Sequence, residues 1–596
     1  MNYTCTIDLI NDLEKHGHLV RIREEVDPHL EMAAIHLRIY EQGGPAILFE
    51  KVKGSPFPAV SNLFGTLERS HFIFRKNFKP VQQLIELKND PIKALKAPFK
   101  NLSLGLLARK AMPKKVSGLP AYFKETTIDQ LPLIQCWPND GGAFITLPQV
   151  YSEDPENPGA MNSNLGMYRI QLNGNDYELN KEVGLHYQIH RGIGVHQTKA
   201  NKLGKPLKVS IFVGGPPANT LAAVMPLPEG ISELTFAGAL AGKRFNYTYV
   251  DGYCVATDAD FVITGEVYPN DTKPEGPFGD HLGYYSLTHD FPVLKVHKVY
   301  HRENAVWPFT VVGRPPQEDT QFGALIHELA GSALKHEIPG LHEVNAVDAA
   351  GVHPLLLAVG SERYTPYQEL KQPQELLTIA NHILGKGQLS LAKYLFITNK
   401  ADNPGVSCQN IEAYFTHLLE RVDWSRDVHF HTKTTIDTLD YSGNAINQGS
   451  KVVIAATGDK KRTLMGSGND DMNLILPGVL VTDFEPFTTY EKANEEIHHY
   501  AKKLSGENLE GIMLIVLADD AMFMEINLNN FLWATFTRSN PANDIYGVDS
   551  FTENKHWGCR GPLIIDARIK PHHAPALIKD KAVERKVDDL MDRLKI

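Results

Sequence analysis

The sequence lacks the short motifs by which many nucleotide-binding, metal-binding and hydrolytic enzymes are recognised. Its 596 residues contain no GxGxxG after a predicted strand, no GxxxxGK[ST], no HExxH and no GxSxG. The nearest match, Gly238–Lys243, is one residue too short between its glycines and lies in a helical pattern, so we expect it to pack. The protein therefore either binds no nucleotide or binds one without a glycine-rich loop.

Cysteine is scarce and unpatterned. The five cysteines are odd in number, widely separated and free of any CxxC or Cys/His spacing, which argues against a zinc site and a disulfide framework. The first residues, MNYTCTIDLINDLEKHGHL, show no basic region followed by an apolar core. These features predict reduced thiols and a cytoplasmic protein.

Long apolar runs and blocks of one charge are also missing. No apolar run approaches the ~20 residues that cross a bilayer. The net charge of −10 comes from 60 Lys+Arg and 70 Asp+Glu spread along the chain, whereas nucleic-acid and membrane-surface partners favour basic patches. We therefore expect no nucleic-acid partner and no membrane span.

Hydrophobic patterning predicts an α/β and α+β protein of several domains. A helix over 4–17 and short strands at 19–22 and 46–49 indicate a small N-terminal α/β domain. Between 118 and 310, β-rich runs such as 208–213, 261–264 and 293–297 alternate with Gly/Pro turns, which indicates a β-barrel or strongly bent sheet with helices near 218–225 and 232–241. The expected domains are 1–115, 116–320, 321–580 and a C-terminal helix over 581–596, which is either an oligomer contact or a docked cap.

A stretch of more than thirty residues recurs 117 positions later without a gap. The first copy keeps Asp402, Asn410, Arg421 and Asp427, and the second has Asp519, Asn527, Arg538 and Asp544 in register. Coincidence between two strand–helix units is the alternative, but the ungapped register favours a duplication at about 390–455 and 507–570. Another strand at 451–454 and a surface loop at 466–471 are expected between the copies.

Asn164, His190 and Glu233 offer an amide oxygen, an imidazole nitrogen and a carboxylate. This set suits Mn²⁺ or Mg²⁺ better than Zn²⁺, and its charge of −1 leaves a bound divalent cation able to attract a phosphate. The alternative is structural: Asn164 caps a turn, His190 is a core histidine, and Glu233 lies in the first turn of a helix that Ser232 opens.

Glu275 and Asp280 stand at the two ends of the turn Glu-Gly-Pro-Phe-Gly-Asp, and Arg169 could supply a countercharge. Two acids in one apolar site differ in pKa, so we expect one to stay protonated near neutrality while the arginine keeps the other ionised. Such a cluster suits proton transfer to carbon. The alternative is that both acids anchor a Gly-Pro turn.

Five separated motifs, in order, resemble the UbiD-type decarboxylases. They are Asn164-x-Gly-x-Tyr-Arg169, His190-Arg-Gly, Gly214-Gly-Pro-Pro217, Met225-Pro-Leu-Pro-Glu-Gly230-x-Ser-Glu233 and Glu275-Gly-Pro-Phe-Gly-Asp280-His-x-Gly-Tyr-Tyr285. The resemblance covers nearly the whole chain. It implies reversible removal of CO₂ from an aromatic or α,β-unsaturated acid with prenylated FMN, and a central domain like the flavin-reductase split barrel.

The resemblance also implies roles for residues. Asn164, His190 and Glu233 would hold Mn²⁺ against the flavin phosphate, with K⁺ nearby in the segment of Met225, and Lys386 would contact the phosphate. Arg169, which also lies against the cofactor, would form the catalytic network with Glu275 and Asp280, and Asp280 would donate the proton. A flavin prenyltransferase would supply the cofactor, and the protein would be a homo-oligomer, a dimer or a hexamer.

Two departures from the family bear on the substrate. The chain is longer than typical members, and the excess coincides with the second repeat copy, so either copy could correspond to the usual C-terminal domain. Aspartate at 280 resembles members that act on phenolic acids, and long members with such a C-terminal extension resemble those linked to quinone biosynthesis. We therefore expect a hydroxylated aromatic acid, a quinone precursor such as a polyprenyl-hydroxybenzoate or a dihydroxynaphthoate. The alternatives are a small phenolic or heteroaromatic acid in catabolism, and a non-catalytic flavin- or metal-binding relic.

Overall fold

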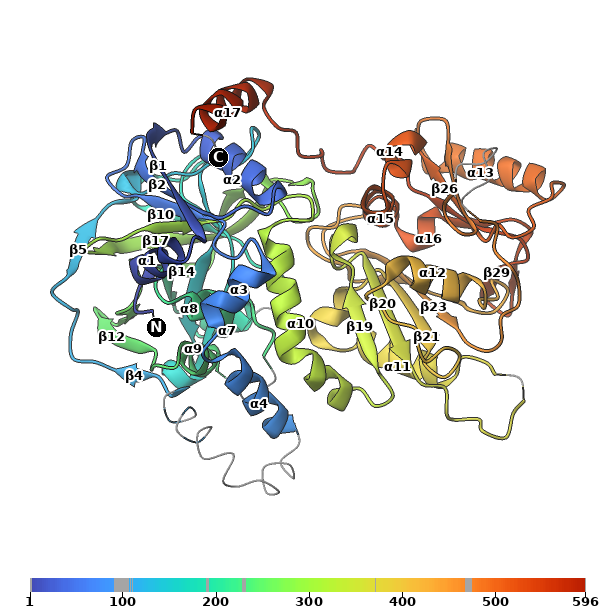
Figure 1. Cartoon of the computed structure of the whole chain (residues 1–596), viewed down its shortest axis with the longest axis horizontal. Coiled ribbons are helices and arrows are strands. Elements are labelled where there is room, and N and C mark those ends of the chain that lie inside the picture. The colour runs from blue at the N-terminus through green and yellow to red at the C-terminus, as the bar shows by residue number, and fades with distance from the viewer. Residues whose placement is uncertain are drawn as a thin grey trace. The chain divides into compact units, whose positions relative to one another are not determined.

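The structure, a computed structural model, describes residues 3–89, 105, 107, 109, 111–188, 192–227, 232–369, 371–466 and 474–594 (Figure 1). Two compact units are present. The first comprises residues 1–330 and 576–596, and the second comprises residues 331–575. The expected surface loop at 466–471 lies almost wholly outside the described residues.

A four-stranded sheet near the N-terminus is completed by a strand from far along the chain. Its order is β1 (Leu19–Val26), β2 (Ala46–Val52), β3 (Ala59–Ser61) and β18 (Trp307–Phe309). β1 runs parallel to β2 in the register Leu19↔Ala46, and β18 runs parallel to β3. The two strands expected at 19–22 and 46–49 are confirmed. Nothing in the sequence around them indicated that β18 would join their sheet.

A nine-stranded antiparallel sheet forms the centre of the first unit, within the described residues. Its order is β6-β9-β10-β17-β14-β11-β7-β8, with β5 beside β17. The strands are β5 (Phe123–Thr126), β6 (Phe144–Ile145), β7 (Pro148–Glu153), β8 (Ser163–Gly166), β9 (Ile170–Gln171), β10 (Glu182–Leu185), β11 (Leu207–Val213), β14 (Phe261–Glu275) and β17 (His289–Arg302). The three expected strands at 208–213, 261–264 and 293–297 are all present. The long β14–β17 pair positions the site because β14 ends at Glu275.

Smaller sheets and helices surround this sheet. The other strands are β4 (Lys114–Lys115), β12 (Asn246–Val250), β13 (Tyr253–Ala256), β15 (Phe278–Gly279) and β16 (Tyr285–Ser286). The helices are α1 (Thr6–Lys15), α2 (Glu31–Glu41), α3 (Leu67–Phe74), α4 (Phe78–Asn89), α7 (Gly192–Lys202), α8 (Pro217–Val224), α9 (Glu233–Ala241), α10 (Glu318–Glu337) and α17 (Lys581–Leu594). The expected helices at 4–17, 218–225 and 232–241 correspond to α1, α8 and α9.

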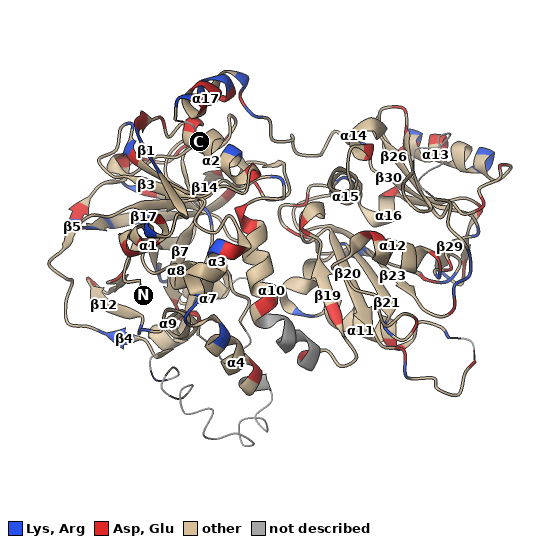
Figure 2. Ribbon diagram, viewed as in Figure 1, with Lys and Arg blue, Asp and Glu red and all other residues tan. Residues whose placement is uncertain are grey.

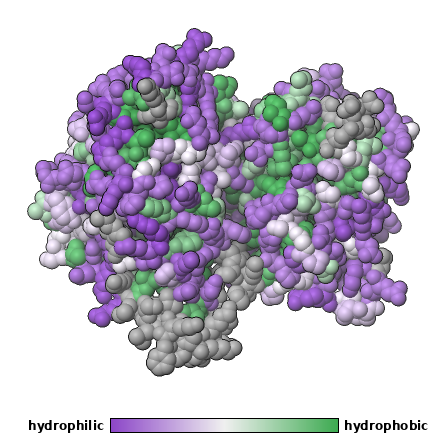
Figure 3. Space-filling model, viewed as in Figure 1, coloured by the Kyte–Doolittle hydropathy of each residue, from purple (hydrophilic) through white to green (hydrophobic). Residues whose placement is uncertain are grey.

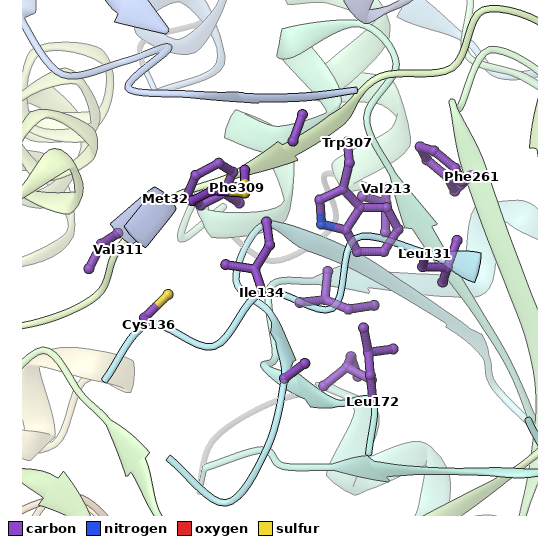
Figure 4. Packing of buried hydrophobic residues seen from close by; sticks show 14 of the residues in the cluster. Met32, Leu131, Ile134, Cys136, Leu172, Val213, Phe261, Trp307, Phe309 and Val311 are labelled. Atoms are coloured by element: carbon purple, nitrogen blue, oxygen red, sulfur yellow. The ribbon is translucent and has the colours of Figure 1, made fainter. Parts of the chain in front are cut away.

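One hydrophobic core joins the N-terminal sheet to the central sheet (Figure 4). Met32 from α2 and Phe309 from β18 lie in it beside Phe261 and Val213 from the central sheet. Trp307 is fully buried there and packs edge-on against Phe261. A shared core of this kind means that the segments expected as domains 1–115 and 116–320 stabilise each other by common burial of apolar surface.

The C-terminal helix α17 packs on the first unit. Val587 and Met591 are buried in the same core, and burial of such side chains contributes about 1.5–3 kcal/mol each. Arg38 on α2 donates to the Glu584 carboxylate at 2.8 Å. Of the two roles expected for this helix, the docked cap is the one seen within the chain.

The second unit contains two five-stranded sheets with the same plan. The first has the order β19 (Glu343–Ala346), β20 (Leu355–Gly360), β21 (Tyr394–Asn399), β23 (Gly449–Ala456) and β22 (Val428–Thr434). The second has β24 (Leu474–Leu476), β25 (Val479–Asp483), β26 (Leu514–Ala518), β30 (Leu563–Asp566) and β27 (Ile545–Gly547). In both, the three middle strands are parallel and the two outer strands antiparallel. The middle strands are almost continuously apolar because helices cover parallel sheets on both faces.

The remaining elements of the second unit are mostly helical. They are α11 (Glu375–Leu384), α12 (Ile411–Leu419), α13 (Tyr490–Leu504), α14 (Ala521–Glu525), α15 (Leu528–Thr537), α16 (Pro541–Asp544) and the hairpin of β28 (Ser550–Glu553) and β29 (His556–Cys559). The strand expected at 451–454 lies within β23.

The repeated acidic residues make equivalent contacts in the two sheets. Asp402 follows β21 and accepts a hydrogen bond from the Gly458 amide after β23, at 2.8 Å. Asp519 follows β26 and accepts one from the Ile569 amide after β30, at 2.6 Å. Each carboxylate therefore ties together the carboxyl ends of two neighbouring parallel strands.

The repeated asparagines and the second pair of aspartates also correspond. Asn410 caps α12 by accepting from the Ala413 amide, and Asn527 caps α15 by accepting from the Asn530 amide. Asp427 and Asp544 each accept from the amide four residues earlier, at 2.9 and 2.7 Å. Local hydrogen bonding accounts for each of these repeated positions.

Charges of both signs are mixed along the ribbon, and α17 carries both (Figure 2). Hydrophilic residues cover most of the face of each unit that Figure 3 shows. None of the described helices combines the length and the apolar character that a membrane crossing requires.

Candidate functional site

Arg169, Glu275 and Asp280 come from three different strand ends of the first unit. Arg169 directly precedes β9, Glu275 is the last residue of β14, and Asp280 follows β15. β15 and β16 form a short hairpin in which Phe278 pairs with Ser286. The turn between Glu275 and Asp280 therefore folds back beside Arg169, and the fold brings the three predicted catalytic residues together.

Arg169 uses its whole guanidinium to bridge the two acids. Nε and Nη2 donate to the two Glu275 oxygens at 2.8 and 2.7 Å. Nη1 donates to Asp280 Oδ2 at 2.5 Å, and Nη2 also donates to Ser286 Oγ at 2.7 Å. The Glu275 side chain is fully buried, and the side chains of Arg169 and Asp280 are 8% and 9% exposed. The arrangement is a buried bidentate ion pair with a second carboxylate attached.

Both carboxylates are held in the ionised form. Burial would raise the pKa of Glu275, but the charge of Arg169 and hydrogen bonds from His186 and Arg169 lower it to about 2. Burial opposes ionisation of Asp280 as well, yet the hydrogen bond from His281 and the charge of Arg169 lower its pKa. The expectation that one acid stays protonated near neutrality is therefore wrong for this arrangement, because a single arginine donates hydrogen bonds to both acids and lowers the pKa of each.

His186 is a member of this cluster that the sequence reasoning missed. It follows β10, and its Nδ1 lies 3.1 Å from Glu275 Oε2. Its amide points to the Arg169 carbonyl at 3.4 Å, so the two residues face each other across the end of the β9–β10 ladder. The sequence gave only an isolated histidine in a polar run, which carries little information by itself.

Asp140 is a second missed residue, and it braces the turn that carries Asp280. Its Oδ1 accepts from the Gly279 amide at 2.7 Å, while Oδ2 accepts from the Trp137 and Cys136 amides at 2.9 and 3.1 Å. Burial raises the pKa of Asp140 to about 7 against these hydrogen bonds. Because three main-chain amides point at its two oxygens, the ionised carboxylate is the form that satisfies them all.

Trp137 completes this brace. A Cβ on Gly279 would lie 2.0 Å from the Trp137 ring, so only glycine fits there. The Trp137 indole nitrogen donates to the Val312 carbonyl at 2.8 Å. The residue before Asp280 is thus fixed on both sides. The sequence did not indicate this role of Asp140, because Asp140 precedes Gly-Gly and that pattern is typical of an ordinary turn.

The structure describes two of the three predicted metal ligands, Asn164 and Glu233. The segments that carry them contact each other, and the start of α7, which follows His190 in the sequence, contacts Asn164. Glu233 opens α9 behind the cap Ser232, as expected, and its carboxylate accepts a hydrogen bond from the amide of Leu165, next to Asn164. A Cβ on Gly192 would lie 2.2 Å from Asn164 Oδ1, so the start of α7 closely approaches Asn164. His190 precedes Gly192 by two positions but lies outside the described residues.

The chemistry of these residues fits a divalent cation. Burial raises the pKa of Glu233, and no ion pair of Glu233 is found among the described residues. Asn164 Nδ2 lies 3.1 Å from the Tyr168 hydroxyl and Oδ1 lies 3.5 Å from the same hydroxyl. An amide oxygen has two lone pairs, so Oδ1 can still offer one to a cation. A buried carboxylate without a countercharge is stabilised by a bound cation.

The other two predicted cofactor residues occupy different places. Met225 is buried at the end of α8 in the first unit. Lys386 belongs to the second unit, where its ammonium pairs with Glu337 at 2.8 Å and its side chain is 45% exposed. Its role in binding a phosphate stays a prediction.

Sequence models of three domains match this chain. The N-terminal domain of 3-octaprenyl-4-hydroxybenzoate carboxy-lyase matches residues 10–88, its Rift-related domain matches 114–315, and its C-terminal domain matches 320–456. The C-terminal match covers the first repeat copy and stops before the second. The first copy is therefore the one that corresponds to the usual C-terminal domain.

Curated relatives of similar length exist in Chlamydia. A protein from Chlamydia pneumoniae that is named as a subunit of 4-hydroxybenzoate decarboxylase is 36% identical over 598 residues, covering 96% of this chain and 95% of the relative. An uncharacterized protein from Chlamydia trachomatis is 36% identical and covers 97% of both chains. A shorter relative from Archaeoglobus fulgidus, 33% identical, covers 77% of this chain and 92% of its own length.

Solved structures share the fold. Vanillic acid decarboxylase from Sedimentibacter hydroxybenzoicus, in its closed form, has a TM-score of 0.64 at 23% identity, covering 84% of this chain and 99% of its own. The UbiD-class enzyme HmfF from Pelotomaculum thermopropionicum, in complex with FMN, has a TM-score of 0.57 at 22% identity, covering 76% and 94%. Together with the three domain matches, the coverage of the relatives shows that this chain belongs to the UbiD family of carboxy-lyases, the family that its motifs resemble.

Proposed function

We propose that this protein decarboxylates a hydroxylated aromatic acid with prenylated FMN and Mn²⁺. The observation that carries the proposal is the buried cluster in which Arg169 bridges Glu275 and Asp280 through three hydrogen bonds and donates a fourth to Ser286. A cluster with two buried acids and one cation has no evident use in a protein that only folds, since burying charges costs free energy.

The residues of the chain divide the work of the reaction. When bound, the prenylated flavin supplies the electron-accepting centre that makes loss of CO₂ from an aromatic ring feasible. Asp280, positioned by Arg169 and by the brace on Gly279, delivers a proton to the ring carbon that has lost its carboxyl group. Glu275 keeps the arginine in place through a bidentate contact, and its own orientation is fixed by His186.

The ionised state of Asp280 sets a condition on this step. A carboxylate that is ionised at rest must gain a proton before it can act as general acid. Displacement of Arg169 Nη1 from Asp280 Oδ2 would raise the pKa of Asp280, because burial would then dominate. We therefore expect substrate binding to loosen this one contact, while the bidentate contact with Glu275 persists.

Asn164, His190 and Glu233 are the residues that would hold the metal. An amide, an imidazole and a carboxylate leave a divalent cation with surplus positive charge, which would hold the flavin phosphate. Met225 would lie beside this site and Lys386 would contact the phosphate, as the family resemblance implies. This mode of binding would explain how the chain dispenses with a glycine-rich loop.

Two classes of substrate are consistent with the proposed reaction. A quinone precursor such as a polyprenyl-hydroxybenzoate or a dihydroxynaphthoate is the first, and the protein would then require a flavin prenyltransferase as the source of its cofactor. A small phenolic acid is the second, and it is favoured by the names of the Chlamydia pneumoniae relative and of the vanillic acid decarboxylase. Asp280 is compatible with both.

The test is to co-produce the chain with a flavin prenyltransferase and to screen aromatic acids for CO₂ release. The screen should contain 4-hydroxybenzoate, vanillate, a dihydroxynaphthoate and a prenylated hydroxybenzoate, with benzoate as the unhydroxylated comparison and cinnamate as an α,β-unsaturated acid. Release from one hydroxylated acid, with flavin absorbance in the purified protein, is the expected result. Flavin absorbance without CO₂ release from any acid would instead support a binding relic.

A further inference from the structure

His186 has one ring nitrogen in use and one without a partner. The side chain is 7% exposed, and its Nδ1 faces Glu275 Oε2 at 3.1 Å. The ring lies against Phe291 with centroids 4.1 Å apart. Nε2 is buried, and it has no hydrogen-bond partner within the described part of the chain.

The contact with Glu275 decides which nitrogen carries the proton. The ionised Glu275 carboxylate can only accept hydrogen bonds, so the hydrogen between the two residues belongs to His186 Nδ1. Burial and the nearby charge of Arg169 lower the pKa of His186, so the ring is neutral. A neutral ring protonated on Nδ1 has a bare lone pair on Nε2.

A buried acceptor without a donor is costly. Leaving such a group unsatisfied is uncommon in folded proteins, and each case calls for a ligand, an ordered water or a strained function. This lone pair belongs to the residue that touches Glu275, inside the cluster that carries the proposed chemistry. Nε2 of His186 is thus an unsatisfied acceptor on a residue that contacts Glu275, and a hydrogen-bond donor that reached it would gain a favourable hydrogen bond.

We propose that His186 Nε2 accepts a hydrogen bond from a ring hydroxyl of the substrate, so that His186 selects hydroxylated aromatic acids. The inference rests on the proposed decarboxylase function and specifies the substrate feature that this site recognises. The carboxylate of such an acid has no proton to offer at neutral pH and its ring C–H groups are weak donors, which leaves the hydroxyl as the matching group.

The test compares 4-nitrophenol with nitrobenzene as ligands of the flavin-loaded protein. The two differ only by the hydroxyl, and neither carries a carboxylate, so no turnover intervenes. Titrations and spectra are recorded at about pH 5.5, because 4-nitrophenol loses its hydroxyl proton near neutral pH and the phenolate has no hydrogen to donate. Isothermal titration should show wild-type protein preferring 4-nitrophenol by about 10- to 100-fold in Kd, since a buried acceptor gains its donor. His186→Asn keeps a donor near Glu275 but loses the distant acceptor, and His186→Phe keeps only the packing on Phe291. Both should lose this preference.

His196→Asn is the matched control, because His196 is a buried histidine whose partner is Ser152 and not the cluster. It should keep the wild-type preference. The inference would be overturned if wild type and both His186 variants preferred 4-nitrophenol over nitrobenzene to the same extent, or if wild type showed no such preference. Should the variants not fold, the spectrum of 4-nitrophenol bound to wild type decides: a shift to longer wavelength relative to an apolar solvent supports the contact, and no shift overturns it.

CO₂ release separates this inference from the function it rests on. Release from a hydroxybenzoic acid together with an unchanged preference in the His186 variants would leave the decarboxylase assignment standing and remove the role of His186. Loss of the preference in the variants, without CO₂ release from any acid, would leave His186 as a hydroxyl-binding residue and remove the decarboxylase assignment.

Discussion

Replacing Arg169 by methionine should destabilise the first unit and should do so more strongly at pH 7 than at pH 5. Methionine fills similar volume and still packs against Phe278, whose ring centre lies 4.7 Å from the guanidinium carbon. The change removes the cation that serves both Glu275 and Asp280. The two carboxylates remain buried without their countercharge.

The magnitude follows from the pKa of Glu275. Its fall from 4.5 to about 2 on folding corresponds to about 3 kcal/mol of stability at neutral pH. This agrees with the roughly 3–5 kcal/mol that removal of one partner of a buried ion pair usually costs. We expect Arg169→Met to lower the free energy of unfolding by about that amount at pH 7.

The pH dependence distinguishes this cause from simple loss of packing. A carboxyl group whose pKa falls on folding contributes stability that is present above its ordinary pKa and is lost as the pH drops toward the folded value. In wild type this pair therefore contributes fully at both pH 5 and pH 7. Without Arg169, burial raises the pKa of Glu275, so the variant should lose more stability relative to wild type at pH 7 than at pH 5.

Urea unfolding at the two pH values, followed by fluorescence and circular dichroism, measures both effects. Lys53→Met is the control, since it removes an exposed cation of the first unit that pairs with Asp27 and should change stability little, because solvent screens an exposed ion pair. A loss below about 1 kcal/mol in Arg169→Met, or an equal loss at pH 5 and pH 7, would refute the electrostatic account of the cluster.

Three further predictions concern the brace, the metal and the second repeat copy. Asp140→Asn places amide hydrogens against main-chain amides and should lower kcat by up to about 100-fold with flavin content unchanged; a normal kcat would show that the brace is dispensable. Glu233→Ala should lose both Mn²⁺ and flavin while its circular dichroism stays native, and full metal occupancy would contradict the ligand assignment. Removal of residues from about 505 onward takes away β26 and α17, so it should expose the apolar strand β25 and the core surface that α17 covers, and cause aggregation or dissociation; a soluble truncation with its native oligomeric mass by light scattering and undiminished decarboxylation would refute this.

The residues of the acid–base cluster could be predicted because two acids stand at the ends of one Gly-Pro turn and an arginine is available as their countercharge. Arg169 and Glu275 are 106 residues apart, yet the Gly-Pro turn after Glu275 and the family motif both marked them. Their protonation was not predictable, because it depends on one guanidinium reaching both acids. Only the geometry shows that Nη1 and Nη2 divide between Asp280 and Glu275.

The supporting residues were missed for a physical reason. His186 and Asp140 act through contacts with Glu275 and Gly279 that are 89 and 139 positions away in the chain, and neither has a local pattern that differs from an ordinary strand end or turn. β18 was missed in the same way, because it joins the N-terminal sheet from across the central sheet. The repeat was predictable, since its equivalent hydrogen bonds require the same residue types at the same spacing.

The most direct test of the account measures CO₂ release by the flavin-loaded protein with a hydroxylated aromatic acid labelled in its carboxyl group. Wild type should release labelled CO₂, and Asp280→Asn and Glu275→Gln should each be slower by roughly 10²–10⁴-fold, with flavin absorbance and metal content unchanged. Wild-type rates in both variants would contradict the account, because the buried acids would then be anchors of the Gly-Pro turn, with no part in proton delivery by Asp280 or in the positioning of Arg169 by Glu275.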